Sequence, residues 1–172
     1  KTDFKDDEIV MKGYAKGGTS MLDAKDFANG KMFDAAINSC GLGEFDNTEL
    51  EKALAGKQAS VNLSINKHYL NVEGTTTPKD LETMLQLTYL NFTNIKKDQK
   101  SYDKTLGLIE TMLKNKALSP DQAFSDSVTV TMNSHNPRFK SLEMSDLKNV
   151  SYDRILDMAK GMTANAADYT FI

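Results

Sequence analysis

The sequence has few of the residues that metal and disulfide chemistry require. Its 172 residues include one cysteine, Cys40, and two histidines, His68 and His135. A single cysteine cannot form an internal disulfide, so the cysteine count points to neither an oxidising nor a reducing compartment. A zinc site needs three or four ligands that converge at about 2.0–2.3 Å, yet one histidine falls in a predicted strand and the other in a loop. We therefore predict no metal site and no catalytic residue in this chain.

The chain also lacks long apolar runs and clusters of basic residues. No run approaches the ~20 apolar residues of a membrane-spanning helix, so no membrane span is expected. The 21 basic and 24 acidic residues are scattered along the chain and give a net charge of -3, which argues against a nucleic-acid partner. Gly17-Gly18 and Gly41-Leu42-Gly43 lack the lysine and the spacing of phosphate-binding loops, so both predict turns.

The composition that remains is that of an ordinary globular protein. Hydrophobic residues make up 40% and charged residues 26%, with a mean hydropathy of -0.47. The length suits one domain with a sizeable core, and we predict a single domain over residues 1–172. The sequence begins at Lys1 without a methionine and ends in the alternating run Asp168-Tyr-Thr-Phe-Ile172, which is typical of a strand. We expect the chain to be a fragment of a larger protein.

The first third of the chain predicts a strand followed by two helices. Residues 9–16 are rich in β-branched and aromatic side chains and end at two glycines, so they predict a strand. Within residues 26–40 a helix is indicated, because four apolar side chains recur at i, i+3, i+4 and i+7: Phe33, Ala36, Ile37 and Cys40. Cys40 is thereby expected to be a buried structural thiol, and Gly41 to end the helix. Asp46 and Glu49 have the spacing of a capping box and predict a second helix to residue 54 or 55.

The rest of the chain predicts a hairpin, a run of helices and a final strand. Residues 59–65 alternate between apolar and polar side chains, and residues 68–73 follow after a short turn. Pro78 opens a helix whose inner face should carry Leu81, Met84 and Leu85. Further apolar stripes predict helices around residues 102–113, 120–135 and 152–162. Strands and helices are thus largely segregated, which indicates an α+β fold with a mainly antiparallel sheet packed against several helices.

Several stretches together resemble the pitrilysin or insulinase family of zinc metallopeptidases. They are GGTS (17–20), INSCGLGEF (37–45), LEKALAGKQASV (50–61), TPKDLETMLQLTYLNFT (77–93), AFSDSVTV (123–130) and NAADYTFI (165–172). The resemblance covers essentially the whole chain and is strongest to the third of four homologous domains in large bacterial members. It implies a fold like the metallohydrolase domain of the pitrilysin and mitochondrial processing peptidase family.

In the catalytic domain of that family, the helix after the first strands carries HxxEH, and a glutamate follows roughly 75 residues later. The two histidines and the later glutamate bind zinc, while the glutamate inside the motif activates water. If Gly41 is matched with the glycine after this helix, the five motif positions fall on Met32, Phe33, Asp34, Ala35 and Ala36. The later glutamate then corresponds to Met112.

The resemblance therefore implies a degenerate motif. Apolar residues stand at the places of the three ligands and the base, namely Met32, Ala36, Met112 and Ala35. No histidine occurs in residues 1–67, so a shift of one or two positions does not restore the motif. Asp34 and Glu110 lie nearby in sequence, but two carboxylates without imidazole make a poor zinc site.

These comparisons of residues imply a function for the chain within a larger protein. It is expected to be a noncatalytic domain of a zinc metallopeptidase that degrades peptides or unfolded polypeptides, with zinc held by an HxxEH domain upstream. Its partners would be the other domains of the same polypeptide and the peptide substrate, around a substrate chamber. Resemblance to envelope-associated bacterial members implies a periplasmic or cell-envelope location.

Two other functions stay open. The family also includes inactive members that scaffold a separate catalytic chain, and the same sequence would serve as such a structural or interaction subunit. The second is a stand-alone enzyme with an unrecognised site, although no convergent set of titratable residues is visible in the sequence.

Overall fold

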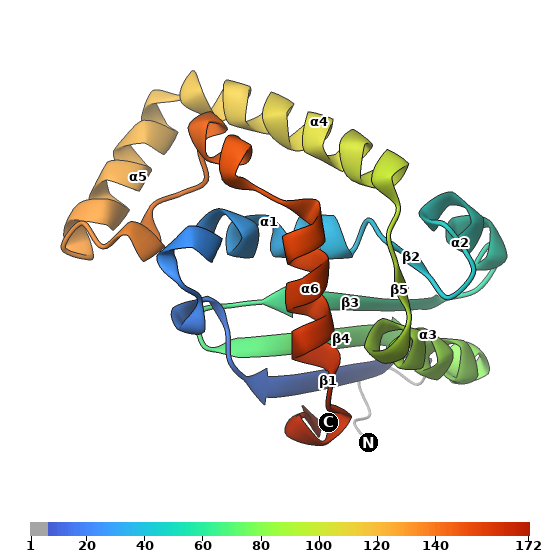
Figure 1. The fold of residues 1–172 in the computed structure, drawn as a ribbon. Coiled ribbons are helices and arrows are strands. Elements are labelled where there is room, and N and C mark those ends of the chain that lie inside the picture. The colour runs from blue at the N-terminus through green and yellow to red at the C-terminus, as the bar shows by residue number, and fades with distance from the viewer. Residues whose placement is uncertain (1–6) are drawn as a thin grey trace.

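The computed structural model describes residues 7–172, so the first six residues of the predicted domain lie outside the described part. A four-stranded antiparallel sheet, in the order β3-β4-β1-β6, forms one layer. Helices α1 and α6 lie over one face of the sheet, and α4 runs across them as an outer layer (Figure 1). This arrangement confirms the predicted α+β fold.

The sheet is built from segments that the alternation of side chains predicted. β1 (Ile9–Lys16) pairs with β4 (Tyr69–Thr76) along its whole length, and β4 pairs with β3 (Ala59–Ile65) in the predicted hairpin. The short β6 (Thr170–Phe171) adds to the other edge of β1. Because alternate side chains of a strand point to opposite faces, every second residue of each long strand is buried or partly buried toward the helices.

The core lies between the inner face of the sheet and two helices. α1 (Phe27–Ile37) packs against α6 (Tyr152–Thr163), and both belong to one hydrophobic cluster with the inward residues of β3 and β4. α3 (Leu81–Thr93) packs on β3 and β4 farther along the sheet. α4 (Gln99–Ala117) contributes Tyr102 and Leu113 to the buried interior, as the predicted stripe requires.

The remaining elements are short or lie at the periphery. α2 (Asn47–Ala53) begins with the predicted capping box, in which the Asp46 side chain accepts from the Glu49 N–H. α5 (Pro120–Met132) follows α4, and Ser119 caps it. Six 3-10 helices connect the larger elements in the described chain: η1 (Thr19–Met21), η2 (Ala24–Asp26), η3 (Pro78–Asp80), η4 (Pro137–Phe139), η5 (Met144–Asn149) and η6 (Ala166–Asp168). Within residues 7–172, every helix is too short or too polar to cross a bilayer.

Gly41 does not end α1, contrary to the prediction. The helix ends at Ile37, and Gly41 instead begins β2 (Gly41–Leu42), which pairs with β5 (Ile95–Lys96) in a two-stranded sheet that the sequence analysis missed. A Cβ at Gly41 would lie 2.2 Å from the Phe45 carbonyl oxygen, so the glycine permits a close approach of two backbones. Two-residue strands carry too little pattern to be recognised from sequence alone.

Two other predictions were wrong in detail. Leu85 is exposed, because the buried face of α3 is formed by Met84, Leu87 and Asn91 at i, i+3 and i+7. His68 lies in the turn of the hairpin and not in β4. The Asn66 side-chain oxygen accepts the His68 N–H at 2.9 Å, which keeps this amide out of the sheet ladder.

Candidate functional site

The helix that resembles the catalytic helix is packed as part of the core. Met32 and Ala36, at the places of the two histidines, have exposed fractions of 1% and 0%, and Phe33 between them is also buried. All three belong to the cluster that contains Ile155 and Ala159 of α6. Their side chains are a thioether, a methyl group and a phenyl ring, so this face has no basic nitrogen or carboxylate to offer a metal ion.

Two polar side chains near the end of α1, Asp34 and the C-cap residue Asn38, bind the backbone of the edge strand β3. Asp34 Oδ1 accepts the Ile65 N–H at 2.8 Å. Asn38 makes two bonds to Leu63, accepting its N–H at 3.1 Å and donating to its carbonyl at 2.9 Å. Burial raises the pKa of Asp34, and the Ile65 N–H opposes this rise. The carboxylate nearest to the degenerate motif therefore serves to attach α1 to the open edge of β3.

The third ligand position lies on a different surface. Met112 has an exposed fraction of 58%, while its neighbour Leu113 points into the interior. Ala35, at the place of the base, is partly exposed on α1. Met32 and Ala36 are thus part of the core, whereas Met112 faces solvent.

The two histidines do not supply the nitrogen ligands that α1 lacks. His68 is exposed in the β3–β4 turn, and His135 is exposed after α5, in a left-handed backbone conformation with φ 55°. Within residues 7–172, no three side chains of His, Cys, Asp or Glu lie close enough together to hold a metal ion. The residues present thus do not fit the zinc that the family resemblance implies for a catalytic domain.

Cys40 is buried and takes part in a small hydrogen-bonded cluster. Its Sγ lies 3.1 Å from Tyr152 Oη and 3.5 Å from the Ala36 carbonyl oxygen. The Tyr152 ring stacks on Tyr102 with a centroid distance of 4.0 Å. Burial raises the pKa of the Cys40 thiol, so the nucleophilic thiolate is disfavoured. The predicted burial of this cysteine is confirmed.

A charged network joins the start of α1 to the start of α6. Arg154 donates two hydrogen bonds to the buried Asp26, at 3.0 Å from Nε and 2.7 Å from Nη2. Asn29 donates to the same carboxylate and accepts the Ser151 N–H at 2.8 Å. The hydrogen bond from Arg154 lowers the pKa of Asp26, against the opposing effect of burial. This network holds two core helices together and leaves the carboxylate no free oxygen for chemistry.

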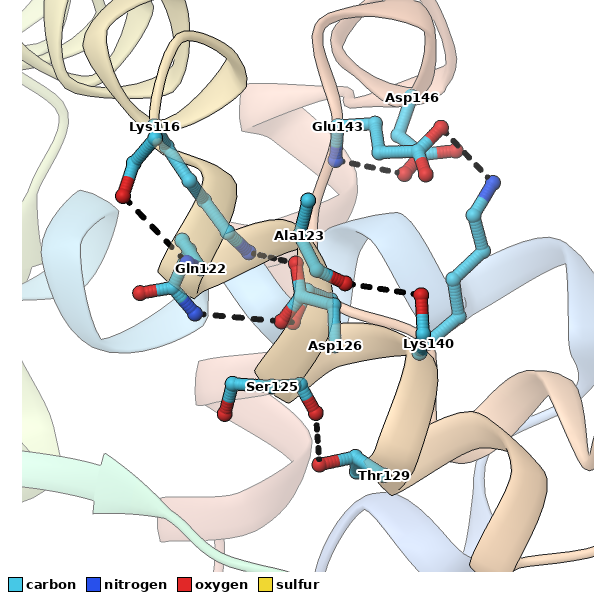
Figure 2. Close-up of polar contacts among 12 residues, drawn as sticks. Lys116, Gln122, Ala123, Ser125, Asp126, Thr129, Lys140, Glu143 and Asp146 are labelled. Carbon is cyan, nitrogen blue, oxygen red and sulfur yellow. Dashed lines mark hydrogen bonds and ion pairs between the residues drawn. The ribbon is translucent and has the colours of Figure 1, made fainter.

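A groove of about 510 Å³ opens between α4, α5 and the segment before η5. Its charged centre is Asp126, which pairs with Lys116 Nζ at 2.8 Å and accepts from Ser141 Oγ at 2.8 Å. Figure 2 shows Lys116 and Gln122 both pointing at Asp126, with the pair of Lys140 and Glu143 beside them. The hydrogen bond from Lys116 lowers the pKa of Asp126, so this carboxylate stays ionised and is a poor proton donor.

Sequence reasoning missed both of these networks. Asp26 and Arg154 are 128 residues apart, and Asp126 and Ser141 are 15 apart. No spacing rule links such pairs, because only the packing of separate elements brings them into contact. The charges in both networks neutralise one another, so neither offers the free acid, base or nucleophile that a catalytic site requires.

Comparisons with known proteins found the same fold in proteases. The sequence matches no protein-family model and no curated protein sequence. The periplasmic protease PqqL from Escherichia coli is similar in structure, with a TM-score of 0.78 and 14% identity over 99% of this chain. A mutant of the ferredoxin protease FusC, solved in complex with Arabidopsis ferredoxin, has a TM-score of 0.69 and 16% identity over 96% of this chain.

A protease from Helicobacter pylori is also similar, with a TM-score of 0.71 and 13% identity over 95% of this chain. The chain spans 19% of the length of PqqL, 18% of FusC and 40% of the Helicobacter protease. In each case, therefore, nearly all of this chain corresponds to one part of a longer protease chain.

Proposed function

We propose that this chain is a noncatalytic domain of a longer zinc metallopeptidase of the pitrilysin or insulinase type. The observation that carries the proposal is the packing of α1, where Met32 and Ala36 are buried as core in the helix that resembles a catalytic helix. The similarity of almost the whole chain to parts of longer proteases supports it. In the longer protein, zinc would be held by an HxxEH sequence upstream of this chain and would activate the hydrolytic water.

The contribution of this domain would be to shape the substrate chamber and to position an extended peptide. No helix within residues 7–172 covers the outer face of the sheet (Figure 1), and this face presents exposed side chains from adjacent strands, among them Val10, Tyr14 and Tyr69. Tyr14 and Tyr69 form an edge-to-face pair with a centroid distance of 6.0 Å. This exposed face of the sheet can hold a substrate in place for a reaction that another domain carries out.

The test uses the complete encoded polypeptide that contains this chain. We expect one zinc ion per polypeptide, and we expect cleavage of an unstructured peptide that stops with a chelator and returns with added zinc. Replacing the upstream motif glutamate by glutamine should abolish cleavage and leave the folding of this domain unchanged. Absence of an upstream HxxEH, or zinc coordinated by residues of this chain, would refute the proposal.

The same experiment separates the alternative of an inactive scaffold. A polypeptide that binds no zinc and cleaves no peptide, with or without a chelator, would favour a structural subunit that supports a separate catalytic chain. For the location, we propose the periplasm or cell envelope, since one structural neighbour is described as a periplasmic protease. Cell fractionation followed by immunoblotting tests this assignment, and recovery in the cytosolic fraction would contradict it.

A further inference from the structure

Helix α5 exposes an apolar stripe on the side that faces away from the domain. Phe124, Val128 and Met132 follow one another at i, i+4 and i+8, with exposed fractions of 72%, 38% and 80%. The opposite side of the helix carries the partly buried Asp126 and Val130. We call Phe124, Val128 and Met132 the α5 stripe. None of the 13 residues of α5 is buried, so this helix is the least supported of the long helices in the described chain.

The rest of the outward surface of α5 is nearly uncharged. The helix has two charged residues, Asp121 and Asp126, and Asp126 is paired with Lys116 toward the domain. Serine and threonine make up most of the remaining exposed positions. Solvated helices are usually rich in charged side chains, whereas the centres of protein interfaces are depleted of them. A helix of this length is also marginal in water unless tertiary contacts cover an apolar face.

The shape of the α5 stripe indicates what covers it. The groove beside Lys116 and Asp126 is lined by Ala123, Asp126 and Ser127 of α5 and not by the stripe. The exposed stripe therefore lies on the convex outer surface of the helix cylinder. Extended peptides bind in grooves or add to sheet edges, which a convex helix does not provide. A folded surface with a complementary hollow fits better. Three side chains on one helix bury far less than the roughly 1,000 Å² of a stable interface between free molecules, but a tethered partner needs less.

We infer that the α5 stripe is the docking surface for another domain of the same longer polypeptide. The inference rests on the proposed function in that it assumes such a polypeptide. It agrees with the solved proteases, in which a part similar to this chain makes up 18–40% of the chain. In this arrangement, the contact would fix the α4–α5 pair against its neighbour and so help to set the shape of the chamber.

The test is cysteine labelling of the complete polypeptide. Val128→Cys places a thiol in the α5 stripe, Met132→Cys is a second variant, and Lys104→Cys on the exposed, charged side of α4 is the control. The native Cys40 is buried, and the unmodified polypeptide measures the background. We expect a polar maleimide to label the two stripe variants at least about tenfold more slowly than the control in the native protein, and at equal rates in urea.

A benzophenone maleimide attached at Val128→Cys then identifies the partner. A cross-link within one polypeptide to a residue outside residues 1–172 supports the inference. A cross-link between two copies, or one that forms only when peptide substrate is added, overturns it, and so does equal labelling of stripe and control. Zinc content and peptidase activity are measured on the same preparations. If the stripe cysteines are protected from the maleimide but the polypeptide binds no zinc, only the proposed function is refuted. If the polypeptide cleaves peptide in a zinc-dependent way but the stripe cysteines are not protected, only this inference is refuted.

Discussion

Replacing Met32 by alanine, with Met112→Ala as the matched change, tests whether the helix that resembles a catalytic helix is core scaffold. Both substitutions remove the same three heavy atoms beyond Cβ. Met32 is 1% exposed and Met112 is 58% exposed, so the two environments differ while the chemistry is constant. We expect a large loss of stability at position 32 and almost none at position 112.

The magnitude follows from the burial. Removing three methylene-sized groups from the core costs roughly 0.8 kcal/mol each in transfer free energy, or about 2.4 kcal/mol. The cavity left in the core cluster that contains Met32 adds to this, so the total should fall near 3 kcal/mol, within the observed range of about 2–5 kcal/mol. At the exposed position the change should stay within about 0.5 kcal/mol.

The assay is equilibrium urea unfolding followed by far-UV circular dichroism, with thermal unfolding as a second measurement. For a domain of this size, a loss near 3 kcal/mol corresponds to a decrease in Tm of about 6–12 °C. Equal losses for the two variants would contradict the packing of α1 described here. A larger loss at Met112 would indicate that α4 turns its other side to the core.

Three other predictions concern the polar contacts. Asp26→Asn should destabilise the protein at pH 7, and the destabilisation should shrink as the pH falls below 3.8. The hydrogen bond from Arg154 lowers the pKa of Asp26, so the contribution of this carboxylate is present above its ordinary value of 3.8 and is lost as the pH falls through the lower folded-state value. Urea midpoints of both proteins over a series of acidic pH values measure this, and a constant difference would contradict it. Ellman's reagent should leave Cys40 unmodified in the native chain and titrate one thiol in urea; reaction at the native state would contradict its burial. Asp34→Ala should accelerate amide hydrogen exchange at Ile65 by about tenfold or more, as read by NMR, and an unchanged rate would mean that this bond does not protect the strand edge.

Local pattern predicted the long elements well. The alternation of residues 59–65 and the stripe from Tyr102 to Leu113 depend on side chains close in sequence, and the structure contains both. The errors occurred at residues whose type and position fit two different structural roles. Gly41 follows a helix and could have ended it, but the backbone of Phe45 comes too close for any side chain at that position. Leu85 belongs to one helical stripe, but α3 packs on the sheet through the adjacent stripe of Met84, Leu87 and Asn91.

The site could be predicted only in part. The positions of the two histidines, His68 and His135, are a property of the sequence, and because they are not four residues apart this chain carries no HxxEH. The sequence did not reveal that Asp34 attaches α1 to β3, nor that Lys116 and Ser141 converge on Asp126. Those contacts join separate elements, and no periodicity within one element encodes the distance to another.

The sequence by itself determined where the long helices and strands lie, and that the chain has only two histidines and one cysteine, because both depend on residue type and short-range spacing. Only the tertiary structure decided how far each buried face extends. It placed Met32 inside the core beside the predicted Ala36, turned Met112 outward, and left the α5 stripe uncovered. The physical reason is that a helix with apolar residues on more than one side can pack in several orientations, and the choice is made by the surfaces that the rest of the chain presents to it.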